Sequence, residues 1–152
     1  MEEIRDEVYR KVAIFFFYAF LDEALATKAT LKAVGKFQSV KSDQETDSLI
    51  VYYTRLIWDQ YRNKFVKGRL RLTANKGWLP PDGSELSSWK EFQKQAEDDE
   101  ILAVIWSHIL EIDDANVSRG LGVTKGTVRF RAARGLRRLG VIRAGEASAS
   151  GI

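Results

Sequence analysis

Cysteine is absent from the 152-residue chain, and histidine occurs once. Without cysteine the protein has no disulfide, no thiol nucleophile and none of the usual zinc-finger sites, and the composition fits a reducing cytoplasm. The one histidine, His108, lies in the apolar sequence IWSHIL, where a histidine at the edge of the core is more common than a catalytic one. Glycine-rich phosphate loops are missing as well. We therefore expect neither an enzyme nor a bound cofactor.

Metal-ligand clusters are equally scarce. Two pairs of adjacent carboxylates, Asp98 with Asp99 and Asp113 with Asp114, are the nearest approach to one. Adjacent residues on a helix point to different faces, so we expect a solvated acidic surface here and no metal site.

A hydrophobic run long enough to cross a bilayer is also lacking. The longest, VAIFFFYAFL, has about ten residues, where a spanning helix needs about twenty. Acidic residues precede it and no cleavage signature follows, so it does not resemble a signal peptide. We expect this run to form a buried helix in a cytoplasmic protein that has no membrane partner.

Strand patterns are rare, and helical patterns take their place. Apolar residues recur every three or four positions from residue 3 to residue 20 and again from 22 to 37. Ser42 and Glu45 form a capping-box pair, which predicts the start of a third helix. We expect this helix to continue to about Phe65. With 45% hydrophobic residues the chain has enough apolar material for a core. The fold class predicted is all-α.

Both prolines and two glycines fall between residues 73 and 88. This composition is typical of a linker or an elaborated loop. Ser88 and Glu91 then form a second capping-box pattern, which predicts a new helix. We expect two small helical domains, 1–72 and 89–142, joined by a flexible linker at 73–88 and followed by a flexible tail at 143–152.

Charge is segregated along the chain, although the net formal charge is only +3. Acidic residues gather between 97 and 114, whereas residues 119–143 contain basic residues and no acidic one. A second basic cluster runs from Arg62 to Arg71. Such segregation attracts polyanions, although a basic run alone is more often a solvated helix face.

Residues 113–139 have the spacing of a helix-turn-helix, and this pattern favours the polyanion interpretation. Asp113 or Asp114 is placed to cap a first helix, Gly122 falls where the turn needs a left-handed backbone, and Thr124 is placed to cap a second helix. The predicted buried stripe of that second helix consists of Val128, Ala132, Leu136 and Leu139. Such a stripe turns Lys125, Arg129, Phe130 and Ala133 outward.

The run VSRGLGVTKGTVRFRAARGLRRL resembles the C-terminal promoter-reading domain of bacterial sigma factors, specifically the small two-domain type called extracytoplasmic-function sigma factors. The family's Leu-Gly-Val-Ser, Gly-Thr-Val and Leu-x-x-Leu elements correspond to residues 121–124, 126–128 and 136–139. The stretch WDQYRNKFVKGRLR is similar to the end of the family's first domain, with Asp59 and Arg62 as its Asp-x-x-Arg.

The resemblance implies a factor that directs core RNA polymerase to promoters, without catalysis. The second helix of the motif would enter the major groove at the upstream promoter element. Residues expected at base edges are Lys125, Thr127, Arg129, Phe130 and Ala133. Residues expected at phosphates or at the polymerase are Thr124, Arg131, Arg134 and Arg137. A surface for the downstream element would be lined by Arg55, Arg62, Lys64, Lys67, Arg69 and Arg71.

Three aromatic residues, Tyr53, Trp58 and Tyr61, are candidates for stacking on unpaired bases, with a place in the core as the more common alternative. The resemblance also implies promoter DNA, core RNA polymerase and an anti-sigma protein as partners.

One departure keeps a second function open. The family's polymerase-binding helix commonly carries an acidic-Gln motif, whereas the matching stretch LATKATLKAVGKF has Lys and Thr. The alternative is a non-sigma helix-turn-helix regulator, or a sigma mimic that binds a protein partner without initiating transcription.

Overall fold

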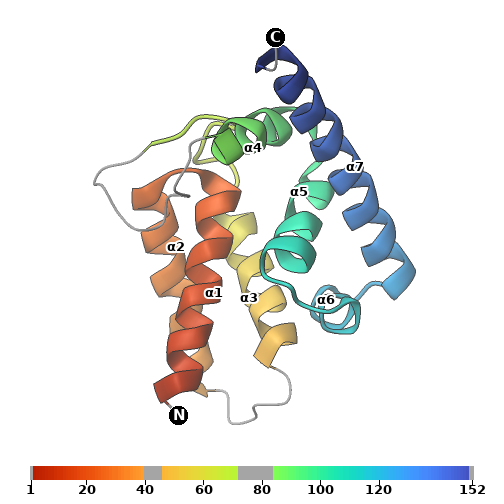
Figure 1. Ribbon diagram of the computed structural model, residues 1–152. Helices are drawn as coiled ribbons and strands as arrows, with labels where there is room; N and C mark the ends of the chain where they lie inside the picture. The colour runs from red at the N-terminus through yellow and green to blue at the C-terminus, as the bar shows by residue number, and fades with distance from the viewer. Residues whose placement is uncertain (1, 40–45, 72–83, 151–152) are drawn as a thin grey trace.

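The computed structural model describes residues 2–39, 46–71 and 84–150, and every structural statement below concerns these residues. Their regular secondary structure is helical, apart from one isolated bridge between Asp22 and Arg71, so the predicted all-α class is confirmed (Figure 1). The helices are α1 (Glu2–Phe20), α2 (Glu23–Gly35), the 3₁₀ turn η1 (Lys36–Ser39), α3 (Thr46–Tyr61), α4 (Ser84–Gln95), α5 (Asp98–Val104), the π-helical turn η2 (Ile105–Ile109), α6 (Asp114–Leu121) and α7 (Lys125–Ser150).

The first half of the chain is built around the aromatic run of α1. Phe15, Phe16, Phe17 and Phe20 are all buried, because α2 and α3 pack against this helix. Phe16 stacks on Phe20 with 5.4 Å between ring centroids. The predicted buried helix is confirmed, and no helix in the described segments is long and apolar enough to cross a membrane.

Helix α3 ends at Tyr61, four residues before the predicted end at Phe65. The following residues form an irregular segment in which Gly68 has a φ of 76° and donates its N–H to the Gln93 side chain at 2.6 Å. Directly after α3, the Lys64 N–H donates to the Tyr61 carbonyl at 2.9 Å in a turn, so the helix does not continue to Phe65. The capping pair Ser42 and Glu45 lies outside the described residues.

The second half begins earlier than predicted. Helix α4 starts at Ser84, so residues 84–88 of the predicted linker are helical, and residues 73–83 lie outside the described part. Ser88 is buried inside α4 and therefore does not cap it. The capping box is found one helix later, where Glu97 and Glu100 bond reciprocally at the start of α5. The prediction of a capping box at Ser88 and Glu91 was wrong. The box at Glu97 was missed because glutamate is not a usual cap residue.

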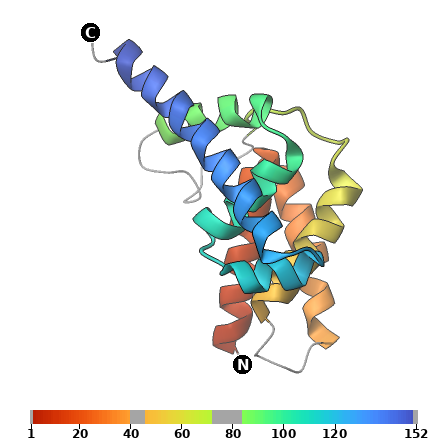
Figure 2. The same cartoon turned by 90° about the vertical axis from the view of Figure 1, so that its right-hand side faces the viewer.

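Helix α7 is much longer than predicted and continues to Ser150. The predicted flexible tail therefore lies in a helix as far as this residue. One reason is a tertiary contact: the Glu146 carboxylate accepts hydrogen bonds from Ser87 and Ser88 of α4. Figure 2 shows α7 running across the face of the molecule, with its C-terminal end projecting beyond the other helices.

The two halves share one core. Trp106 in η2 stacks on Phe15 of α1 with 5.4 Å between centroids, and its indole N–H donates to the Thr54 hydroxyl of α3 at 3.0 Å. Trp89 of α4 donates to the Tyr18 carbonyl of α1 at 2.8 Å. The predicted domains 1–72 and 89–142 are therefore packed together here, and their independence stays a prediction.

Candidate nucleic-acid interface

The turn between α6 and α7 has the local geometry expected from the sequence. Asp113 caps α6 by accepting the Asn116 N–H at 2.8 Å. Gly122 ends α6 with a φ of 71°, a conformation that costs glycine little. Thr124 accepts the Thr127 N–H at 3.1 Å and so caps α7. These three predicted roles are confirmed, and together they define the α6–α7 unit, residues 113–150.

The buried side of α7 differs from the predicted stripe at one position. Val128, Ala132 and Leu139 are buried, but Leu136 is 36% exposed. Gly135 takes its place at the contact, where an added Cβ would lie 2.6 Å from a methyl carbon of Val104. The two helices α5 and α7 therefore meet at Gly135, and Leu136 is turned away from this contact.

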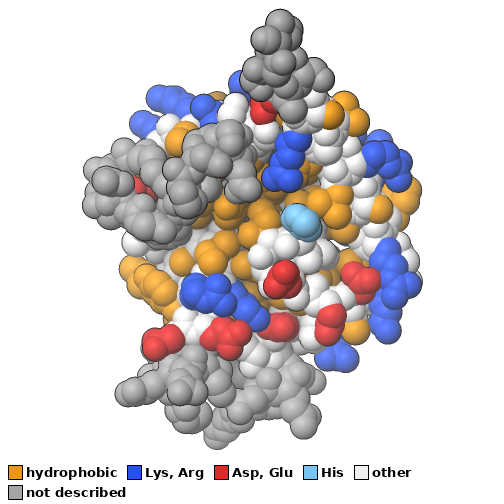
Figure 3. All heavy atoms as spheres, viewed as in Figure 1, with side chains coloured by type: hydrophobic (Ala, Val, Ile, Leu, Met, Phe, Trp, Pro, Cys, Tyr) orange, Lys and Arg blue, Asp and Glu red, His pale blue; other side chains and the backbone are white. Residues whose placement is uncertain are grey.

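The outward face of α7 is open to solvent as predicted. Lys125, Arg129, Phe130, Ala133 and Arg137 are all exposed, and Phe130 retains 62% of its surface. Arg129 makes one exposed ion pair, at 2.8 Å, with Asp114 of α6. Thr127 is half-buried beside Thr124. Figure 3 shows basic side chains along the edge of the molecule that α7 occupies.

On the other edge of α7, the arginines are paired with acidic side chains of α5. Arg131 lies 3.6 Å from Asp99, Arg134 lies 2.8 Å from Glu100, and Arg138 lies 3.3 Å from Glu100. The side chain of Glu100, which belongs to the acidic group at residues 97–114, is only 4% exposed. The sequence marked these acids as a charged cluster but contained no signal of which helix they face.

The basic residues of the first half are divided in the same way. Arg62, Lys64, Arg69 and Arg71 are exposed, as expected of a surface for a polyanion. Lys67 is exposed as well, but its ammonium group pairs with Asp98 at 2.6 Å. Thus the start of α5 attracts cations from both halves of the chain.

The three candidate stacking residues are not equivalent. Trp58 is 4% exposed, and the guanidinium groups of Arg55 and Arg62 lie 5.6 and 5.5 Å from the centre of its ring. The core alternative is therefore correct for Trp58. Tyr53 and Tyr61 are half-buried, with Tyr53 packed edge-on against Phe37.

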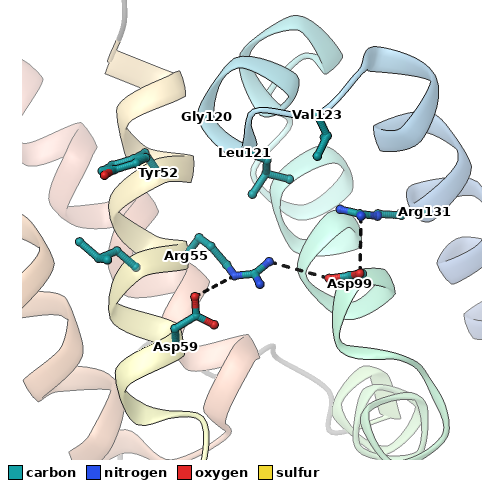
Figure 4. Close-up of a pocket in the computed structure, with 9 residues that line it drawn as sticks. Tyr52, Arg55, Asp59, Asp99, Gly120, Leu121, Val123 and Arg131 are labelled. Carbon is teal, nitrogen blue, oxygen red and sulfur yellow. Dashed lines mark hydrogen bonds and ion pairs between the residues drawn. The ribbon is translucent and has the colours of Figure 1, made fainter.

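A groove of about 440 Å³ lies beside the contact between α3 and α6 and is lined by residues of α3, α5, α6 and α7 (Figure 4). Arg55 reaches into it from α3, where it pairs with Asp59 at 3.2 Å and with Asp99 at 3.8 Å. Arg131 reaches the same Asp99 from α7. One carboxylate of α5 thus joins two arginines from the two halves.

Comparison with known proteins gives a likeness in fold. No family model and no curated protein matches the sequence. A solved structure, the sigma factor RpoE in complex with the anti-sigma factor NepR from Bartonella quintana, is similar with a TM-score of 0.66 and 15% sequence identity. The similarity covers 89% of this chain and 91% of that one, so it includes both halves. The fold therefore resembles that of a sigma factor.

Proposed function

We propose that the protein is a sigma-like transcription initiation factor that binds promoter DNA and directs RNA polymerase to it. The observation that carries the proposal is the exposed face of α7 within a fold that resembles a sigma factor over both halves. In this proposal α6 and α7 are a helix-turn-helix, and α7 enters the major groove. Its geometry suits this role because capped ends define where α6 and α7 begin, while the reading face of α7 stays exposed to solvent.

The residues divide into two proposed roles. Side chains on the open face, Lys125, Arg129, Phe130 and Ala133, contact base edges, with Thr127 at the rim. Thr124 and Arg137 contact phosphates or the polymerase, and so do Arg131 and Arg134 once they leave their acidic partners. In the first half, Arg55, Arg62, Lys64, Lys67, Arg69 and Arg71 form the proposed surface for the downstream promoter element.

A second candidate is a sigma mimic that binds a protein partner without initiating transcription. It is favoured by α2, where Thr27, Lys28 and Lys32 replace the acidic-Gln motif. Lys28 is exposed, and Lys32 donates a hydrogen bond to Gln60 of α3 at 2.7 Å. A cationic α2 would need a differently charged partner surface from that of an acidic one.

An anti-sigma protein is a further proposed partner, supported by the neighbouring structure, in which a sigma factor is bound to one. In the present chain this partner is inferred from the likeness in fold.

Binding to purified core polymerase, followed by promoter-dependent run-off transcription, tests the main proposal. A sigma-like factor forms a complex with the core enzyme and supports transcripts from a defined start. A mimic fails to give transcripts whether or not it binds the polymerase. An α2 charge variant, Lys28→Glu, sharpens the test, because docking through α2 should respond to this change whereas the matched variant Lys94→Glu on α4 should not change it.

A further inference from the structure

The basic segment, residues 62–71, follows α3 and contains no helix of its own. It has no acidic residue, and its five basic residues are all exposed: Arg62, Lys64, Lys67, Arg69 and Arg71. Within the part of the chain that the structure describes, only Lys67 among them has an acidic partner. An irregular segment keeps its charges in fixed positions only where specific contacts hold its backbone.

One end of the basic segment is bound to the turn between α1 and α2. The Arg71 N–H donates to the Leu21 carbonyl at 2.8 Å, and the Glu23 N–H donates to the Arg71 carbonyl at 2.9 Å. Leu21 itself is buried with a φ of 53°, a conformation that residues other than glycine rarely adopt. Strained backbone persists where the surrounding contacts hold it, so this turn is a fixed point of attachment for the segment.

The middle of the basic segment is held by Gln93 of α4, which is 1% exposed. The side-chain carbonyl oxygen of Gln93 accepts the Gly68 N–H at 2.6 Å, and the amide nitrogen donates to the Ala19 carbonyl at 2.6 Å. Ala19 lies in the last turn of α1, where carbonyl groups have no partner within the helix. One buried carboxamide therefore satisfies a donor of the basic segment and an acceptor of α1.

Gly68 is the residue that makes this hydrogen bond possible. It is buried with a φ of 76°, and a Cβ added to it would lie 2.9 Å from the Lys90 carbonyl oxygen of α4. A side chain at residue 68 would push the segment away from α4 and its N–H away from Gln93. The attachment thus depends on a matched pair, a glycine in the basic segment and a glutamine in α4.

We infer that Gln93 is a positioning residue for nucleic-acid binding, and this inference rests on the proposed function. The carboxamide of Gln93 fixes the backbone between Lys64 and Arg71, so the basic side chains there are ordered before the nucleic acid arrives. Gln93 itself is buried and does not touch the ligand. A segment that is ordered in advance loses less conformational entropy on binding, so it binds more tightly than the same charges on a loose segment.

Gln93→Leu tests the inference, because it removes both hydrogen-bonding functions and no charge. The probe is a fluorescent single strand of oligothymidine, about 12 nucleotides long. The measurement uses the full chain with Arg129→Ala and Arg137→Ala, which weaken binding through α7. We expect Gln93→Leu to weaken binding about tenfold in fluorescence anisotropy. The salt slope should stay the same, whereas Arg69→Gln should lower it by about 0.7.

Two controls separate positioning from stability and from changes in α4 itself. Thr54→Val removes a buried hydroxyl that accepts the Trp106 N–H, so it lowers stability without touching the basic segment. Gln95→Leu replaces an exposed glutamine of α4. Urea denaturation checks that each variant is folded under the assay conditions. A tenfold loss of affinity in either control would assign the effect to stability or to α4 and would overturn the inference.

Amide signals in nuclear magnetic resonance measure the ordering of the segment directly. In Gln93→Leu the Gly68 N–H should exchange with solvent faster, while the N–H groups of α7 exchange as before. In the wild-type chain the amide signals of residues 62–71 should shift when oligothymidine is added. Faster exchange with unchanged affinity would contradict the inference, and so would binding of the strand without shifts in residues 62–71.

The failure of the inference can be told apart from the failure of the proposed function. The outcomes that overturn the role of Gln93 leave DNA binding through α7 intact, and with it the proposed function. If the wild-type chain bound neither the single strand nor any duplex, the proposed function would fall, and the inference with it.

Discussion

The two edges of α7 contain the same kind of residue in two different situations. Arg129 and Arg137 lie on the open edge, whereas Arg131, Arg134 and Arg138 lie on the edge that faces α5. Arg137 and Arg138 are neighbours in sequence but differ by about 100° around the helix axis. The difference teaches that a basic run is not one surface: helical phase decides which arginines are available to a ligand and which stabilise the fold.

The largest effect is expected from removing the carboxylate of Glu100, which pairs with arginines on the edge of α7 that faces α5. Glu100→Gln should lower the free energy of unfolding by about 2.5 kcal/mol, because it removes the charge that pairs Arg134 and Arg138 in a buried position and weakens the α5 capping box. Urea denaturation measures the change. Glu111→Gln, at an exposed site, should stay within about 0.5 kcal/mol. Equal effects of the two variants would show that Glu100 does not hold the arginines.

Substitutions on the open edge of α7 should change the affinity for DNA more than the free energy of unfolding. Arg129→Ala is expected to cost about 1–3 kcal/mol on the preferred DNA sequence and to narrow the advantage over altered sequences, because a guanidinium can pair bidentately with guanine. Selection from a randomised duplex library, followed by titrations on the selected and altered sites, gives both numbers. Arg129 is 67% exposed in its ion pair with the half-buried Asp114, so losing this pair should affect stability little. A uniform loss on all sequences would contradict the base-edge assignment.

The smallest effect is expected in the salt dependence of DNA binding, where Arg134 and Arg137, about one helical turn apart, should differ. Arg137→Ala should weaken binding to all duplexes similarly and reduce the salt slope by about one, as expected for a phosphate contact. Arg134→Ala should change the slope less and the stability more, because Arg134 is occupied by Glu100. Titrations at several salt concentrations, together with urea denaturation, compare the two. If both variants change the slope equally, the ion pair does not compete with DNA.

Predictability from sequence differs between the turn and the helix that follows it. Asp113, Gly122 and Thr124 were correctly predicted because a cap depends on neighbours within a few residues. Leu136 was assigned to the core because helical spacing places it beside Val128 and Ala132, and this was wrong. Its exposure follows from the approach of α5 at Gly135, which local spacing does not contain.

In the first half of the chain, too, some features could be predicted from local sequence and others depended on tertiary contacts. The aromatic run of α1 had to be buried, because no ten-residue apolar run is stable in water as an exposed helix. The end of α3 was predicted too late: the chain turns after Tyr61, and the N–H of Gly68 in the following segment donates to the Gln93 side chain of α4. Ser88 resembled a cap but lies inside α4, and Glu146 bonds to it from α7.

The sequence by itself determined the helical class, the caps of the α6–α7 unit and the outward direction of Lys125, Arg129, Phe130 and Ala133. These features depend on backbone propensity and on a period of 3.6 residues, which act over a few neighbours. Only the tertiary structure decided that Asp99 and Glu100 neutralise one edge of α7, and that Gly120 seats α6 on α3. Those contacts join helices far apart in the chain, and their partners are selected by packing of the whole core.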